Sequence, residues 1–398
     1  MTTPVQPTTG NTHISSNFGA LLAPGLRKIF FETYAEVPEQ FSRVYKINKS
    51  TKAKETDYGL GAFGDWVERA TNLSEVSYDT LTAGDERVYV HRAFTKGFMI
   101  ERELYDDEQY RQINKFPAAM ARAGRAFVEK EAVTPIKNGF LNATPIFDGK
   151  ALFSNAHPLV DSSGVGDNLV TGALTDTNLK IAMQCMRETV DEAGNLINSS
   201  PKLLVVPPAL EHTAKALMNS TQIVGSDYND VNTVKGALDI VVWDYMGAAA
   251  GGNDTSWFIM DPTLAQLNFF WRIKPEFKWD EDFDTFVAKY RGYMRFSYGL
   301  SDWRGMVGSL GGTASATPVF TALEEDDVAV AVTTCVSGAK LDLYKNGVII
   351  KTATTSGTTH SFTGVSFAVG DKVAVVQTET GKVPTESTIN TVVADTAA

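Results

Sequence analysis

The sequence predicts a mixed α+β body followed by a separate all-β domain. An Ala-rich stretch at residues 117–130 has strong helix propensity. Apolar runs near Leu203, Ile240 and Trp257 are typical of strands in the same body. Beyond a Gly- and Ser-rich segment that starts at Gly311, short apolar runs alternate with turn residues at the spacing of a small sandwich. At 398 residues, the chain has room for two or three domains of ordinary size.

The N-terminal part is expected to be a loose arm, then a helix, then a long hairpin. Residues 1–17 are rich in Thr, Pro, Ser and Asn, which bury too little apolar surface to offset the entropy of ordering. From Pro24 to Val37, apolar residues recur at spacings that predict an amphipathic helix of about three turns. Residues 49–92 are polar and Gly-punctuated with alternating stretches, which predicts a two-stranded excursion. Because so long an excursion is unusual inside one compact domain, we expect it to pack on another subunit.

Two further helices and a short strand are expected in the body. The helix that includes Pro117–Lys130 should end or kink at Pro135, because proline lacks the amide hydrogen. A later helix is predicted from Thr177 to Glu192, with Gly194 just after its end. A short strand is predicted at Phe98–Ile100.

The C-terminal part carries the clearest local signal for a hairpin. Asn346 and Gly347 lie between two apolar pairs, and both residue types tolerate the positive φ of a tight hairpin turn. The glycines at 311 and 312 predict a flexible linker with few contacts on either side. We therefore expect the all-β domain to fold independently of the body.

Composition and charge exclude several classes of protein. Lys and Arg total 36 against 47 Asp and Glu, so the net charge of -11 makes tight wrapping of nucleic acid improbable. The two cysteines, Cys185 and Cys335, argue against a disulfide framework or a Cys-based zinc site. No apolar run approaches the ~18 residues of a membrane helix, and the polar opening residues lack the pattern of a secretory signal. We expect synthesis in the cytosol and no membrane contact.

A glycine motif in the excursion matches a nucleotide-binding pattern only in its spacing. Gly59-Leu-Gly-Ala-Phe-Gly64 has the spacing of a dinucleotide-binding turn, but a charged stretch precedes it and no βαβ unit surrounds it. We interpret it as the flexible tip of a projecting hairpin, with Trp66 as a contact aromatic.

One histidine deserves comparison with a catalytic base. His157 lies in FSNAHP with Ser154 and Asp148 or Asp161 nearby, but the loop has no nucleophile elbow and offers no partners for catalysis. A structural histidine is the preferred interpretation.

An acidic series resembles a calcium loop in part. Asp280, Asp282 and Asp284 alternate as calcium ligands do, but a Thr stands where the loop needs glycine, so a solvated acidic strand face is preferred. No nucleophile, base and oxyanion donor occur together. We therefore predict no catalytic, cofactor-binding or metal-binding residues, and no enzyme.

The candidates for an assembly interface are the excursion and a cationic cluster at its start. The lysines are interpreted as partners of acidic groups on a neighbouring copy rather than of phosphate, because the chain is acidic overall. The candidate residues are Gly59, Gly61, Phe63, Gly64, Trp66, Lys49, Lys52 and Lys54.

Two segments, and the order of the others, carry a resemblance to a known family. They are DGKALFSNAHP at residues 148–158 and YMRFSYGLSDWRGMVGS at residues 293–309. Together with the arm, the hairpin, GFMIERELYDDEQY and the Ala-rich helix, they make residues 18–310 resemble the major capsid proteins of tailed bacteriophages, particularly the Mu-like major head subunits. The C-terminal part resembles a bacterial Ig-like domain through YKNGVIIKT and VGDKVAVVQTE.

The resemblance implies a Hong Kong 97-type coat fold and a structural role. The implied parts are an N-terminal arm and helix (1–49), an extended loop (50–95), a peripheral domain with a spine helix (96–149 and 276–312), an axial domain (150–275) and an Ig-like outer domain (313–398). The implied function is self-assembly into hexamers and pentamers of an icosahedral shell around double-stranded DNA, without a cofactor.

The resemblance also implies partners and a location. Scaffolding and portal proteins would take part in assembly, packaged DNA would be touched non-specifically, and the Ig-like domain would meet host-surface glycans or proteins. The protein would reside in the virion after assembly in the host cytoplasm. The alternative is a surface-binding, adhesin-type protein with an Ig-like recognition module, which should carry a secretion signal or repeated modules.

Overall fold

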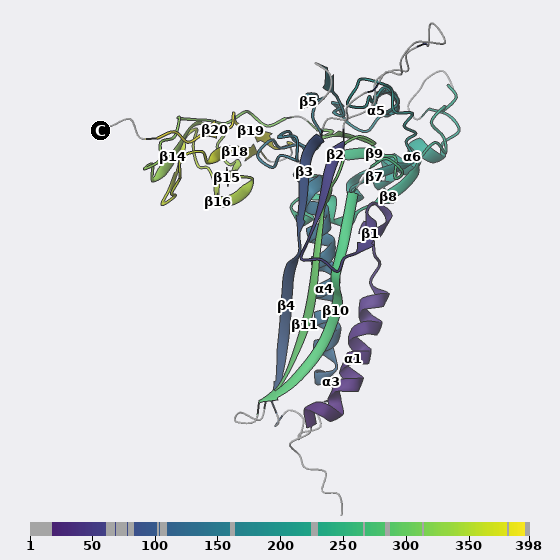
Figure 1. Ribbon diagram of the computed structural model, residues 1–398, viewed down its shortest axis with the longest axis vertical. Coiled ribbons are helices and arrows are strands. Elements are labelled where there is room, and N and C mark those ends of the chain that lie inside the picture. Colours follow the sequence, from purple (N-terminus) through teal and green to yellow (C-terminus); the bar gives the residue numbers. More distant parts are fainter. Residues whose placement is uncertain are drawn as a thin grey trace, which may run out of the picture.

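The computed structural model describes residues 18–60, 68, 78, 83–101, 103, 110–159, 164–223, 230–265, 267–282, 287–312, 314–379 and 382–394. An elongated body carries a small β domain that projects sideways from its upper part (Figure 1). Helices and strands mix within the body, which confirms the α+β fold class. No helix in the described part of the chain is long and apolar enough to cross a bilayer.

A long four-stranded sheet in the order β1-β10-β11-β4 forms the lower part of the body (Figure 1). β10 (Leu267–Asp282) and β11 (Val287–Leu300) pair antiparallel along almost their whole length. β1 (Lys46–Lys49) pairs in parallel with β10, and β4 (Arg92–Glu101) pairs antiparallel with β11. The strand expected only at Phe98–Ile100 is therefore longer. Its alternation is hard to recognise because Lys96 interrupts the apolar series Phe94, Phe98 and Ile100 on one side, and Met99 is exposed on the other.

Two helices cover one face of this sheet. α1 (Phe18–Glu36) and α4 (Lys115–Lys137) run beside one another, and α3 (Tyr110–Ile113) precedes α4. α4 confirms the long helix, and Pro135 lies in its last turn. α1 begins six residues before Pro24, so it is longer than predicted. Phe30 of α1 stacks on Phe277 of β10, with ring centroids 5.2 Å apart.

A buried glutamate on α4 joins three parts of the body. Glu129 is 2% exposed and accepts hydrogen bonds from the backbone N–H of Gln40 at 2.8 Å and from Trp243 Nε1 at 3.0 Å. Gln40 precedes the short helix η2 (Phe41–Arg43), and Trp243 precedes η4 (Asp244–Met246). Burial raises the pKa of this carboxyl, although the hydrogen bonds it accepts act in the opposite direction.

A second sheet, in the order β12-β9-β7-β8, forms the upper part of the body. Its strands are β7 (Leu203–Val206), β8 (Asp239–Val242), β9 (Trp257–Met260) and β12 (Met306–Ser309). The first three confirm the predicted apolar strands. The expected borders between axial and peripheral parts do not coincide with sheet borders, because β10 runs through residue 276 and β12 belongs to the upper sheet.

The upper sheet shares a core with two helices. α5 (Asp176–Arg187) and α6 (Glu211–Asn219) contribute buried apolar residues to it, and α6 was not predicted. α5 ends five residues before the predicted Glu192, because the Asp191 side chain accepts backbone N–H groups of Ala193 and Asn195 and forms a turn. Smaller elements are η3 (Pro208–Leu210), η5 (Ala248–Ala250), β5 (His157–Pro158) and β6 (Val165–Gly166).

The C-terminal part is all-β, as predicted, and consists of two sheets around their own apolar core. One sheet contains β13 (Val319–Phe320), β14 (Ala329–Thr334) and β17 (His360–Thr363). The other contains β15 (Lys340–Lys345), β16 (Val348–Thr354), β18 (Lys372–Thr378), β19 (Thr385–Glu386) and β20 (Asn390–Thr391). Asn346 and Gly347 have φ of 50° and 79°, which confirms the predicted hairpin turn between β15 and β16.

The expected flexible linker with few contacts is wrong. Gly311 has a φ of 74°, and a Cβ there would lie 1.9 Å from the Thr255 carbonyl oxygen. Thr255 Oγ1 also donates to the Leu310 carbonyl at 2.7 Å. An apolar cluster further joins the loop after α4 to the C-terminal sheets: Leu141, Ala143, Tyr344, Ala374 and Val376. Glycine composition predicts backbone freedom, but packing from both sides removes it here.

Candidate assembly interface

The long excursion is a two-stranded hairpin with two different faces. β2 (Lys54–Leu60) pairs antiparallel with β3 (Ala83–Val90), which confirms the predicted two-stranded form. Because side chains alternate along a strand, Arg87 and Tyr89 lie on one face, and Val88 and Val90 lie on the other.

The inner face of the hairpin packs on its own subunit. The Tyr89 ring lies 5.2 Å from that of Phe270, and the Tyr89 and Ser301 hydroxyl oxygens are 2.5 Å apart. The Arg87 guanidinium lies over the Phe147 ring at 3.7 Å. Burial raises the pKa of Tyr89. The expectation that the excursion packs only on another subunit is therefore wrong for this face.

The outer face carries exposed apolar side chains flanked by Lys54 and by Glu86, which accepts a hydrogen bond from the Tyr58 hydroxyl at 3.3 Å. Tyr58, Val88 and Val90 are 60%, 44% and 64% exposed. Thr56 lies opposite Val88, and Lys54 lies opposite Val90 in the register. Single exposed apolar residues are ordinary, but neighbouring ones on one rigid face are typical of an interaction surface. We name Lys54, Thr56, Tyr58, Glu86, Val88 and Val90 the outer hairpin face.

The predicted lysines lie at the base of this hairpin. Lys49 ends β1 and Lys54 begins β2, and both are exposed. Lys52, between them, forms an ion pair with Glu55 at 3.2 Å. Of the predicted tip residues, Gly59 lies within β2. Gly61, Phe63, Gly64 and Trp66 lie outside the described residues.

The base of the hairpin also holds a buried histidine that sequence reasoning missed. His91 separates β3 from β4 and is 5% exposed. Its Nε2 lies 2.9 Å from Ser50 Oγ, and its Nδ1 lies 2.9 Å from Ser297 Oγ. Ser50 Oγ donates in turn to Glu55 Oε1 at 2.6 Å. No motif marks this group, because Ser297 lies far away in the sequence.

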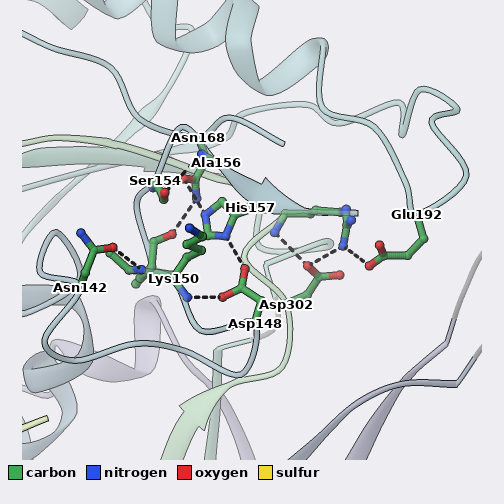
Figure 2. A network of polar contacts seen from close by, with 12 residues as sticks. Asn142, Asp148, Lys150, Ser154, Ala156, His157, Asn168, Glu192 and Asp302 are labelled. Atoms are coloured by element: carbon green, nitrogen blue, oxygen red, sulfur yellow. Dashed lines mark hydrogen bonds and ion pairs between the residues drawn. The ribbon is translucent and has the colours of Figure 1, made fainter. Parts of the chain in front are cut away.

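Figure 2 shows that His157 belongs to a buried structural network. The residue is 0% exposed, and its Nδ1 lies 2.5 Å from Asp148 Oδ2. Its Nε2 lies 3.2 Å from Asn168 Oδ1, and its ring stacks on Trp303 with centroids 4.2 Å apart. The preferred structural interpretation agrees with this burial, but the expectation that the histidine lacks partners is wrong.

The network lacks the arrangement of a hydrolase. Ser154 Oγ accepts from the backbone N–H of Ala156 at 3.2 Å (Figure 2). The buried imidazole has no access for a substrate, and Asp161 lies outside the described residues. The described hydrogen bonds of this network fix the loops around His157.

The network joins the two segments that carry the family resemblance. His157 comes from the first segment, and Trp303 comes from the second. Next to them, Arg304 forms ion pairs with Glu192 at 3.0 Å and Asp302 at 3.3 Å. Burial raises the pKa of Asp302, while the positive charge of Arg304 opposes this shift. The two segments therefore hold each other in place.

The described residues of the acidic series lie in β10. Asp280 is exposed in β10 and lies opposite Lys289 of β11. Asp282 ends the same strand, and Asp284 lies outside the described residues. Within the described ranges, no group of His, Cys, Asp or Glu side chains could hold a metal ion.

Comparison with known proteins agrees with this architecture. The family model "Phage capsid protein" matches residues 85–309, which is more than half of the chain. The major capsid protein of Escherichia phage Mu is 35% identical over 77 residues, covering 19% of this chain and 25% of that protein. The match thus spans a quarter of the length of this curated relative.

Solved capsid structures are also similar. The PhiM1 mature capsid subunit has 13% identity and a TM-score of 0.44, covering 67% of this chain and 84% of that one. The Mycobacterium phage Patience structure has 13% identity and a TM-score of 0.44, covering 77% and 94%. The JBD30 procapsid has 15% identity and a TM-score of 0.41, covering 74% and 75%.

The fold and the family match define a viral coat protein. The chain belongs to the phage capsid protein family. Its hairpin excursion and its long helix α4 correspond to the extended loop and the spine helix that the Hong Kong 97-type resemblance implied.

Proposed function

We propose that this chain is the major head subunit of a tailed bacteriophage. It self-assembles into hexamers and pentamers of an icosahedral shell that encloses double-stranded DNA. The family match supports a coat protein, and the uncovered outer hairpin face supports assembly through the excursion.

The outer hairpin face has the chemistry of a protein contact. Its exposed Tyr58, Val88 and Val90 gain free energy when a neighbouring copy covers them, at roughly 25 cal/mol per Å² of apolar surface. Lys49 and Lys54 beside it suit acidic groups of that copy, since the chain has a net charge of -11. Many weak, identical contacts of this kind close a shell.

The proposal extends to partners and place. Scaffolding and portal proteins take part in assembly, the inner wall touches DNA without sequence preference, and the finished subunit resides in the virion after assembly in the host cytoplasm. The C-terminal sandwich, an Ig-like domain by resemblance, faces outward and meets host-surface glycans or proteins. The subunit has no catalytic role, because the buried His157 network serves packing.

A charge on the outer hairpin face tests the proposal. Val90→Glu should abolish shells in negative-stain microscopy while the subunit stays folded and soluble, because Val90 is 64% exposed. Val165→Glu is the matched control, since Val165 is 63% exposed on the body surface. Deleting residues 56–88 should give the same soluble, shell-free protein. Normal shells from Val90→Glu and from the deletion would refute assembly through this hairpin.

A further inference from the structure

We infer that His91 is a positioning residue that sets the hairpin for assembly, and that it does so only as a neutral ring with its proton on Nε2. The inference deepens the proposed function and rests on it. The observations behind it are the hydrogen bonds at the base of the hairpin. The family match gives no role to the residues that form them.

The tautomer follows from the partners. The Glu55 carboxylate only accepts hydrogen bonds, so the Ser50 hydroxyl donates its hydrogen to Glu55 at 2.6 Å. Ser50 Oγ must then accept from His91, which places the proton on Nε2. Nδ1 is left as an acceptor, and the Ser297 hydroxyl donates to it. One directed chain thus runs from Ser297 through His91 and Ser50 to Glu55.

The chain of hydrogen bonds connects the hairpin to the long sheet of the body. Ser297 lies in β11, the middle of the long sheet, and is 4% exposed. Glu55 lies in β2 of the hairpin, and His91 lies at the junction of β3 and β4. The ring therefore fixes the angle at which the outer hairpin face leaves the sheet.

Protonation works against this arrangement. A proton on Nδ1 removes the acceptor of Ser297 and puts a cation near Arg295 of β11 and Arg272 of β10. The negative charge of Glu55 in β2, which is itself paired with Lys52, favours the protonated ring and raises the pKa of His91. Burial is the largest effect and lowers the pKa of His91 below the ordinary 6.5. Since the folded state binds fewer protons, the stabilisation is present above pH 6.5 and is lost as pH falls through the lowered pKa.

The first test reads the ring directly in the unassembled subunit. Nitrogen NMR of protein labelled at histidine should show a neutral His91 ring with the proton on Nε2 at pH 7. A proton on Nδ1, or a charged ring at that pH, overturns the inference whether or not shells form.

The second test uses assembly. His91→Gln keeps a donor and an acceptor at one amide, so it should form shells. It should also lose the decline in shell formation that we expect of the wild type as pH falls through the lowered pKa of His91. His91→Ala should form distorted or few shells at every pH. His212→Gln, on exposed α6, is the control and should behave as wild type. A His91→Gln variant with the wild-type acid response overturns the inference, whereas failure of the wild type to form shells at any pH overturns the proposed function.

Discussion

Gly166 illustrates how a single residue fixes the contact between the two family-resembling segments. A Cβ at this position would lie 2.2 Å from Cη2 of Trp303, the ring on which His157 stacks. The glycine is therefore required by close approach and not by an unusual backbone angle. The sequence offers no signal for this, because a glycine in a Gly-rich loop predicts only flexibility.

The Gly166→Ala substitution should push Trp303 off the His157 ring. Overpacking of a well-packed core costs about 2 kcal/mol, so we expect a lower unfolding free energy by that amount. Denaturant unfolding followed by tryptophan fluorescence measures it. Gly357→Ala is the control, because its Cβ would meet nothing within 4 Å. Equal stability of both variants would contradict the close packing.

The His157→Ala substitution should destabilise the subunit without removing any activity. It leaves the 5% exposed Asp148 carboxyl buried without its partner, and breaking a buried pair costs about 3 kcal/mol. Thermal unfolding of the variant, compared with His212→Ala on exposed α6, gives the magnitude. An unchanged melting temperature, or loss of turnover on a defined substrate, would contradict a structural role.

At the scale of elements, carboxyl groups tie separate segments together. Glu129 on α4 binds the backbone before η2 and the Trp243 indole, so the N-terminal segment, the long helix and the upper sheet share one polar contact. Glu386 of β19 plays a similar part at the C-terminal sheets, accepting from the backbone N–H of Asn142 at 2.7 Å.

Glu386 makes the contact between body and C-terminal sheets sensitive to pH. Burial raises its pKa from 4.5 to about 6, while the backbone N–H groups of Asn142 and Ala143 lower it. The folded state therefore binds more protons than the unfolded state between these values, and the contribution of Glu386 to stability falls as pH rises through about 6. The unfolding free energies at pH 4.5 and pH 7 should differ less in the Glu386→Gln variant than in the wild type. The same pH dependence in both proteins would exclude Glu386 as its source.

At the scale of the whole molecule, the C-terminal sheets have their own core and also a shared contact. The core residues of the two sheets come from the C-terminal part alone. The contact with the body combines an apolar cluster that includes Leu141 and Ala143 with the hydrogen bond from Asn142 to Glu386. We therefore propose an independent outer domain that docks on the body without completing its core.

A chain truncated at Gly312 should still form shells with a thinner outer profile in electron microscopy. The isolated fragment 313–398 should unfold cooperatively in calorimetry, because its core is self-contained. The truncated body should unfold at a somewhat lower temperature, since Leu141 and Ala143 become exposed. Aggregation of the body, or a fragment without a thermal transition, would show that the two parts share one core.

The sequence by itself determined the helix around Pro117–Lys130, the apolar strands, the Asn346-Gly347 turn and the family resemblance. Local periodicity predicts the helix and the strands, and turn chemistry predicts the turn. The family resemblance lies in short contiguous segments of the sequence. The interface candidates were predicted only in part. The sequence predicted the hairpin, but it did not predict the outer hairpin face, because the register between β2 and β3 decides which side chains lie together there.

Only the tertiary structure decided the long-range pairings. His91 meets Ser297, and His157 meets Trp303, through contacts between residues far apart in the sequence. The packing of Gly311 was likewise decided by Thr255, a residue distant in the sequence that no local pattern specifies. The physical reason is that hydrogen bonding and close packing depend on which segments the fold brings together, whereas periodicity records only how each segment faces its own core.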